Sequence, residues 1–342
     1  MKAAEPLATT PAVGTEPEFG AAPGPRTASA ATLRNDTAVQ GAIFAGLVLV
    51  IAVAPFVAYP VFVMRVMCFA LFASAFNLLL GFGGLLSFGH AAFFGLASYV
   101  CSTAALSFGL TPEVSILLGT GSAGLLGAVF GVVAIRRQGI YFAMITLALA
   151  QIVYFVCLQA PFTGGEDGIQ GVPRGRLFGV IDISRDGVLY VLVAVVFLGG
   201  LALITRIVHS PFGQVLRAIR ENENRALSLG YRVDRYRLAV FVMSATLSGL
   251  AGSTKALVFQ LASLTDVHWT MSGEVVLMTL IGGVGTIFGP TLGALVFVAL
   301  EFYLASLGSW VTVVEGAVFV VCVLAFREGI VGVLAQRFRR PL

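Results

Sequence analysis

The sequence predicts an all-α membrane protein that crosses the bilayer many times, and two observations carry this prediction. Of the 342 residues, 58% are hydrophobic and only 11% are charged, less than half the roughly 25% of an ordinary soluble domain. Long stretches without Asp, Glu, Lys or Arg also recur along the chain, and a helix of about 20 such residues crosses ~30 Å of hydrocarbon. Membrane β-barrels show shorter, alternating segments. The composition excludes a soluble enzyme, a disordered chain and a collagen-like fibre.

Eight to ten transmembrane helices are expected. The stretch 66–112 is 47 residues long and must contain two crossings, which separate at Gly81–Gly84. Segment 274–288 is short and glycine-rich, and either it or the start of 84–108 could be a re-entrant or broken helix. The expected helices are 40–58, 61–80, 84–108, 113–134, 139–160, 188–205, 237–262, 274–288, 290–307 and 310–326.

The basic residues predict the orientation, because short loops rich in Lys and Arg stay in the cytoplasm. With ten crossings and a cytoplasmic N-terminus, 16 of the 21 Lys and Arg residues lie inside. Both termini are therefore expected in the cytoplasm. Residues 1–38 are predicted to be a disordered tail, 39–327 the transmembrane domain, and 328–342 a basic C-terminal tail.

Two glycine-interrupted segments, one in each half of the chain, show a weak internal sequence similarity. GFGGLLSFG (81–89) and IGGVGTIFG (281–289) share three identities at an offset of 200. Broken segments in the two halves of a transporter indicate the substrate path, whereas glycines between packed helices allow close backbone approach. Both interpretations stay open, and His90 is either a hydrogen-bonded packing residue or a gate. The candidate path residues are Asn77, Gly83, Gly84, Ser87, Gly89, His90, Gly282, Gly283, Gly285 and Gly289.

The longest internal polar loop, 206–237, has the pattern of two short amphipathic helices. Pro211 can open the first helix, and Gly230 is placed to end the second with a positive φ. Alternation of acidic and basic residues favours docking of a partner protein over attraction to anionic lipid, which is the alternative. The candidate docking residues of this loop are Phe212, Arg217, Arg220, Glu221 and Gly230.

Three charges fall inside predicted helices, where charge is costly and often functional. Lys255 is expected either to pair with Glu301 across helices or to snorkel outward. Glu315 is expected near the outer interface. A structural role is the first interpretation of each charge, and Glu301 is the candidate carboxylate for an ion-coupled carrier.

The chain offers no chemistry for an enzyme and is expected to bind no cofactor, metal or nucleic acid. A phosphate-binding loop needs GxxxxGK[ST], and the only two lysines, Lys2 and Lys255, stand in no such motif. Four cysteines and three histidines lie far apart in sequence and form no metal-ligand pattern. Any ATPase that drives this protein must be another chain.

Several blocks of the sequence resemble the branched-chain amino-acid ABC transporter permease family, and its second type of permease subunit in particular. The likeness extends in order over about 81–333. It is carried by GFGGLLSFGHAAFFGLASYV (81–100), GIYFAMITLALAQ (139–151), TGGEDGIQGVP (163–173), PFGQVLRAIRENENRALSLGYRVDRYRLAVFVMSATLSGLAGS (211–253), GGVGTIFGPTLGALV (282–296) and FREGIVGV (326–333).

This resemblance implies a subunit of an importer in the cytoplasmic membrane. Its expected partners are a second permease subunit, two cytoplasmic ATPase subunits and an extracytoplasmic solute-binding protein. Glu221 and Gly230 fall in the coupling segment, which departs from the usual motif because Asn222 and Glu223 stand where small residues are typical. The expected solute is a branched-chain or other neutral amino acid. Urea or short amides, an ion-coupled carrier and a non-transporting scaffold are the alternatives.

Overall fold

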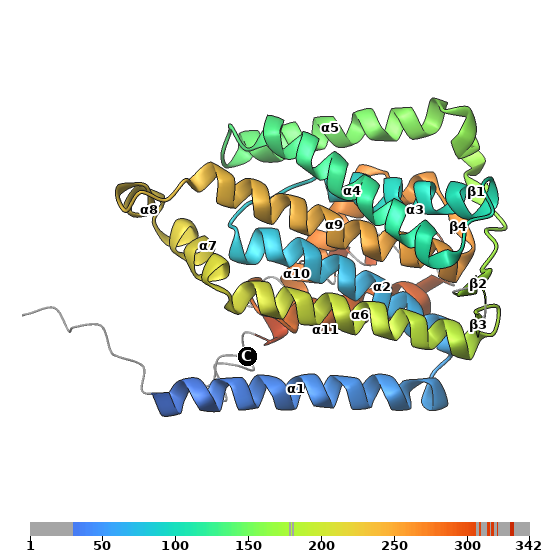
Figure 1. Cartoon of the computed structure of the whole chain (residues 1–342), viewed down its shortest axis with the longest axis horizontal. Helices are drawn as coiled ribbons and strands as arrows, with labels where there is room; N and C mark the ends of the chain where they lie inside the picture. Colours follow the sequence, from blue (N-terminus) through green and yellow to red (C-terminus); the bar gives the residue numbers. More distant parts are fainter. Residues whose placement is uncertain are drawn as a thin grey trace, which may run out of the picture.

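The computed structural model describes residues 30–177, 179 and 181–305, with short pieces at 308, 313, 314, 316, 317, 320 and 329–331. Within this part of the chain nearly all regular structure is helical (Figure 1). The α-helices are α1 (Ala30–Val57), α2 (Pro60–Asn77), α3 (His90–Leu106), α4 (Pro112–Ala134), α5 (Ile140–Gln159), α6 (Asp186–His209), α7 (Pro211–Glu221), α8 (Glu223–Ser228), α9 (Val233–Phe259), α10 (Trp269–Gly282) and α11 (Gly289–Leu304).

Short elements connect these helices. A π-helical turn, η1 (Leu78–Phe82), follows α2, and three 3-10 turns are η2 (Pro161–Thr163), η3 (Gly165–Asp167) and η4 (Leu264–Asp266). Strands β1 (Ile169–Gln170) and β4 (Leu261–Ala262) pair antiparallel, as do β2 (Arg176–Leu177) and β3 (Ile181–Asp182). The β1–β4 pair ties the 160–185 connection to the segment after α9.

The prediction of an all-α polytopic membrane protein is confirmed. Among the described residues, four helical segments are both long and apolar enough to cross a bilayer: Pro60–Phe82, Pro112–Ala134, Ile140–Gln159 and Asp186–His209. Shorter apolar helices accompany them. The predicted helix 310–326, which contains Glu315, lies almost wholly outside the described residues.

Three predicted boundaries need correction. Helix α1 begins at Ala30, so 30–38 are helical rather than part of a disordered tail, and 1–29 lie outside the described residues. The helix expected from 84 begins at His90. The helix expected over 274–288 is α10, which ends at Gly282 because Gly283 (φ +121°) and Gly285 (φ +81°) leave the helical region.

Helix α9 forms the centre of the bundle and packs against α2, α3 and α4. Small residues let these helices approach closely, as is typical of membrane helix pairs. A Cβ atom on Gly119 would lie 2.6 Å from the carbonyl oxygen of Ala97, and one on Gly252 would lie 3.0 Å from Cα of Phe94. Helices α1 and α5 lie on opposite sides of this centre (Figure 1).

Helix α1 is fastened to α6 at a proline. Pro55 has no N–H, so the carbonyl of Ile51, four residues earlier, loses its intrahelical donor. The hydroxyl of Tyr190 on α6 donates to this carbonyl oxygen at 2.6 Å. The side chain of one helix therefore repairs the hydrogen-bond gap in the other.

Replacing Tyr190 with Phe should lower the free energy of unfolding by about 1–3 kcal/mol, because it leaves the buried Ile51 carbonyl without a donor. Chemical unfolding of the purified protein in mixed micelles measures this change. Tyr303→Phe, which removes an exposed hydroxyl, is the matched control and should change little. Equal stability of both variants would show that the Tyr190 hydroxyl does not replace the hydrogen-bond donor that Pro55 lacks.

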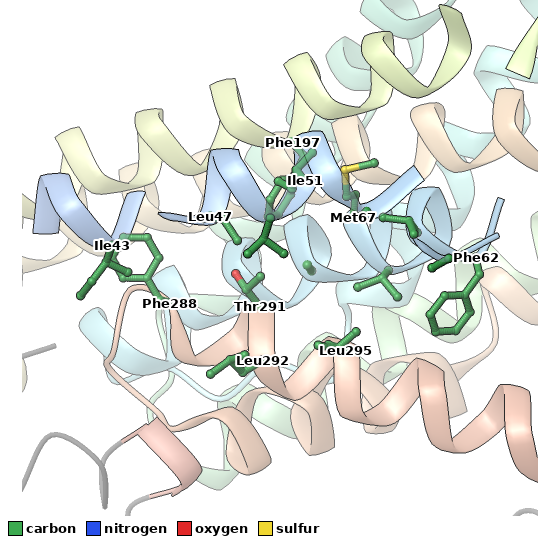
Figure 2. A pocket seen from close by; sticks show the side chains of 16 residues that line it. Ile43, Leu47, Ile51, Phe62, Met67, Phe197, Phe288, Thr291, Leu292 and Leu295 are labelled. Atoms are coloured by element: carbon green, nitrogen blue, oxygen red, sulfur yellow. The ribbon is translucent and has the colours of Figure 1, made fainter. Parts of the chain in front are cut away.

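An apolar cavity of about 450 Å³ lies between α1 and the rest of the bundle. Figure 2 shows side chains of α1, α2, α6 and α11 around it, including Leu47, Met67, Phe197 and Leu292. Among the described residues that line it, Thr291 has the single polar side chain. Because these walls offer almost no hydrogen-bonding groups, the cavity does not suit a polar or zwitterionic solute.

Candidate translocation and coupling site

The two glycine-rich segments interrupt helices in similar ways. The first runs from the π turn Leu78–Phe82 through non-helical residues 83–89 to α3, and the second joins α10 to α11. The residues that precede α3 and α11 have nearly the same backbone: Gly89 has φ −98°, ψ 0° and Phe288 has φ −96°, ψ −11°. We call residues 78–89 the first break and 283–288 the second break.

Asn77 holds the two breaks together. Its side-chain oxygen accepts from the N–H of Gly285 at 2.9 Å, and its Nδ2 donates to the carbonyl of Thr286 at 2.7 Å. Gly81 fits against this clamp because a Cβ atom there would lie 2.6 Å from the backbone nitrogen of Gly285. Asn77 was a candidate because it precedes the first glycine-rich segment, but nothing in the sequence indicates that the two segments are in direct contact.

The remaining candidate glycines serve close packing at these breaks. A Cβ atom on Gly83 would lie 2.6 Å from the Leu79 carbonyl oxygen, and one on Gly89 would lie 2.9 Å from the Thr146 carbonyl oxygen. A Cβ atom on Gly282 would overlap the carbonyl of Gly289. The packing interpretation therefore has direct geometric support, and the path interpretation stays a prediction.

Hydroxyl groups from distant helices satisfy the backbone at the start of α3. The N–H groups of a first helical turn have no partner within the helix. Thr146 of α5 accepts from the Phe88 N–H at 3.2 Å, and Ser272 of α10 accepts from the Ala91 N–H at 2.9 Å. The predicted Ser87 accepts from the Gly89 N–H at 3.2 Å. Thr146 and Ser272 were missed, because an isolated hydroxyl in an apolar helix gives no pattern to read.

His90 is fully buried in a box of aromatic rings. Its Nε2 lies 2.9 Å from Oγ of Ser244, which itself donates to the Ala75 carbonyl at 2.5 Å. The Ser244 hydroxyl has one proton and donates it to the Ala75 carbonyl. It must therefore accept the hydrogen bond from His90, which places the imidazole proton on Nε2. The rings of Phe76 and Phe93 meet the imidazole edge-on. His90 thus occupies a hydrogen-bonded packing position, and a gating role is untested.

The two short helices predicted in the 206–237 loop are present. Ser210 and Asn222 cap α7 and α8 with their side-chain oxygens, accepting from Gly213 N–H at 3.4 Å and Arg225 N–H at 3.0 Å. Gly230 has φ +85° and ends α8, as predicted. The Tyr231 N–H bonds the Ala226 carbonyl at 3.1 Å, the pattern of a Schellman cap.

Two arginines of α7 contact the first break while remaining partly exposed to solvent. The Arg217 guanidinium lies 5.2 Å from the centre of the Phe82 ring, and Nη1 of Arg220 donates to the Gly81 carbonyl. Glu221 is exposed, and so are two leucines at the end of α8, Leu227 at 52% and its C-cap Leu229 at 71%. These exposed leucines were missed as candidates, since the sequence cannot say which face of α8 the bundle covers.

Glu223 fastens the loop to the body of the protein. Both of its carboxylate oxygens accept from the Arg237 guanidinium at 2.9 Å, and Oε1 also accepts from Gln138 at 2.9 Å. This bond with Arg237 holds the pKa of the Glu223 carboxyl below its usual 4.5, while burial opposes the shift. Asn222 caps α8 and Glu223 bonds Arg237 and Gln138. These contacts explain why larger polar residues stand at positions 222 and 223, where small residues are typical of the coupling segment.

The Glu223 pair should make the stability of the loop depend on pH. A lowered folded-state pKa contributes stability that is complete above about pH 4.5 and is lost as the pH falls through the folded value. Thermal unfolding between pH 3 and 7 should show this loss in the wild type. Glu223→Gln should show a lower midpoint at neutral pH and a smaller decline toward acid. A decline of the same size in Glu223→Gln would contradict this role.

The intramembrane charges pair differently from the sequence prediction. Lys255 does not meet Glu301; its Nζ lies 2.6 Å from Oδ2 of Asp266, and both side chains are buried. Glu301 instead accepts from Arg65 at 2.5 Å. The prediction was wrong because the short connection after α9 folds back and brings η4 over the end of that helix. Glu315 lies outside the described residues.

These features define a class of protein: a helical membrane protein with a glycine break in each half and two short amphipathic helices at one end. Residues 59–323 match the family described as "Branched-chain amino acid transport system / permease component", and the chain belongs to this family.

Curated relatives carry names from the same kind of system. Over 288 residues the chain is 25% identical to the high-affinity branched-chain amino acid transport system permease protein LivM of Escherichia coli (strain K12). This match covers 77% of this chain and 68% of the relative. LivM of Salmonella typhimurium is 25% identical over 328 residues, covering 86% and 76%. A probable permease protein LivH of Methanocaldococcus jannaschii is 25% identical over 267 residues, covering 72% and 83%. No solved structure matches the chain.

Proposed function

We propose that this chain is a permease subunit of an ATP-driven importer of branched-chain or other neutral amino acids. The observation that carries the proposal is the α7–α8 element, which exposes Glu221, Leu227 and Leu229 and contacts the first break through Arg217 and Arg220. Such an element can receive a push from a docked protein and pass it to the membrane segments. Family membership supports this use of the loop.

The end of the bundle that holds α7 and α8 is proposed to face the cytoplasm. The turn after α4 contributes Arg136 and Arg137 and meets the loop through the bond between Gln138 and Glu223. Seven further arginines lie between 206 and 237. Loops rich in arginine stay inside. Both termini are proposed to lie on this side of the cytoplasmic membrane.

The proposed assembly contains a second permease subunit, two ATPase subunits and an extracytoplasmic binding protein. The chain itself has no phosphate-binding loop, so the energy source must be separate. Its similarity to both LivM and LivH relatives supports a membrane path built from two related subunits. A binding protein can set the choice of solute, so urea and short amides remain alternative solutes for this permease.

An ion-coupled carrier is the second candidate function, and it depends on Glu301. The Arg65–Glu301 ion pair accounts for that carboxylate structurally, which favours the ATP-driven importer. Uptake of labelled leucine into proteoliposomes separates the two. Uptake should require ATP and the ATPase subunits and should survive Glu301→Gln. Uptake driven by an ion gradient alone, and lost in Glu301→Gln, would refute the ATP-driven importer. No uptake under either condition would favour a scaffold.

A further inference from the structure

Arg220 completes the hydrogen bonding of the first break. In a continuing α-helix the N–H of Leu85 would bond the carbonyl of Gly81. Here Leu85 donates to the Leu79 carbonyl instead, at 3.3 Å. Nη1 of Arg220 supplies the donor to Gly81 from a helix 139 residues further along the chain. The end of this membrane helix is therefore capped by the coupling loop.

Glycines on both breaks form the slot that admits the Arg220 side chain. A Cβ atom on Gly84 would lie 3.0 Å from Cγ of Arg220, and one on Gly285 would lie 3.4 Å from its Nη1. Both glycines also have a positive φ, of +69° and +81°. The slot thus touches the first break and the second break at once.

The contacts continue beyond the slot into the rest of the protein. Asn77 clamps the second break to the end of α2. Gly329, from the described piece 329–331, packs so closely on Gly283 that a Cβ atom there would lie 2.5 Å from the Gly283 nitrogen. Arg217, one helical turn before Arg220, rests on the ring of Phe82. Movement of α7 must therefore displace the contacts of both breaks.

We propose that Arg220 is a latch between the coupling loop and the membrane path. While its guanidinium occupies the slot, Arg220 helps Asn77 to hold the two breaks in contact. When α7 moves away, the Gly81 carbonyl is freed and only the Asn77 bonds remain, so the breaks separate more readily. This inference rests on the proposed function, because the ATPase subunits supply the movement of α7. It gives Arg220 a positioning role and leaves docking of the ATPase to the other exposed residues of α7 and α8.

The planar guanidinium suits this role better than an ammonium group. Its rigid fork presents several donors in one plane, whereas lysine offers a single flexible charge that is more strongly hydrated. Arg220→Lys should therefore keep the charge of the loop and still lose much of the latch. Arg136→Ala is the matched control, since Arg136 is exposed in the turn after α4, outside α7 and α8, and its side chain forms no hydrogen bond within the described residues.

The experiment uses the complete transporter in proteoliposomes and measures leucine uptake, ATP hydrolysis and thiol labelling. Arg220→Ala and Arg220→Lys should keep the ATPase subunits bound and hydrolysing ATP. Uptake per ATP should fall on the order of tenfold, a typical size for coupling between sites. A cysteine at the half-buried Val284, on the second break, should react with an impermeant thiol reagent faster by a similar factor. Arg136→Ala should match the wild type in all three measurements.

Two outcomes would overturn the latch. In the first, the Arg220 variants keep both uptake per ATP and the labelling rate of Val284→Cys within about twofold of the values measured with Arg220 intact. The other is loss of the ATPase subunits from the purified Arg220 variants, which would make Arg220 a docking residue. Failure of the wild type to take up leucine with ATP would count against the proposed function instead. The labelling measurement needs only this chain, so it tests the latch contact in that case as well.

Discussion

Replacing Asp266 with Asn is expected to lower the free energy of unfolding by about 3–5 kcal/mol, the usual cost of breaking a buried ion pair. Nζ of Lys255 lies 2.6 Å from the Asp266 carboxylate, and the two side chains are only 9% and 4% exposed. Removing the negative charge leaves the ammonium of Lys255 at the end of α9 without a counter-charge. Unfolding of the purified protein in mixed micelles measures the loss.

The double variant Lys255→Met, Asp266→Leu separates an ion-pair effect from damage to η4. A buried pair replaced by apolar residues of similar size is often neutral or better, so the double variant should recover most of the stability. Asp186→Asn is the control, because Asp186 pairs with Arg174 while 57% exposed and such pairs contribute about 0–1 kcal/mol. If Asp266→Asn costs no more than Asp186→Asn, the buried pair is not a major support of this end of the protein.

Hydropathy and glycine positions were enough to predict most of the fold. In lipid every backbone group must be satisfied within the protein, so long apolar stretches can only be helices. Glycines in a run such as Gly81–Gly84 predicted an interruption, and Gly84 indeed has φ +69°. Pro211 and the apolar spacing after it predicted α7, since that helix buries one face and exposes the other.

The partners of polar groups could not be predicted, because they depend on how distant helices meet. Lys255 had several acidic residues as possible partners, and only the fold-back of 260–268 selects Asp266. Arg220 was expected in the docking loop, and its exposure leaves that prediction open, but nothing in the sequence indicates that its guanidinium also bonds the Gly81 carbonyl of the first break. The start of α1 was missed for a different reason: residues 30–38 are too polar to be read as membrane-spanning, although they continue the same helix.

Replacing Asn77 with Leu is expected to separate the two breaks and to have the second largest effect on the protein. Leucine keeps nearly the same size but leaves the N–H of Gly285 and the carbonyl of Thr286 without their bonds to Asn77. Each of the two unsatisfied groups costs about 1–3 kcal/mol, so the free energy of unfolding should fall by about 2–6 kcal/mol. Transport should fall with it, because Arg220 would then cap only the first break.

Asn77→Asp tests the geometry of the clamp more finely than Leu does. The carboxylate can still accept from Gly285, but it faces the Thr286 carbonyl with a second acceptor and cannot donate. It should therefore lose stability despite keeping one bond. Thr205→Val is the matched control, since among the described residues the Thr205 hydroxyl bonds only the Leu201 carbonyl of its own helix, at 2.8 Å. If Asn77→Leu changes stability no more than Thr205→Val, the contact between the breaks does not depend on Asn77, and the latch would act on the first break alone.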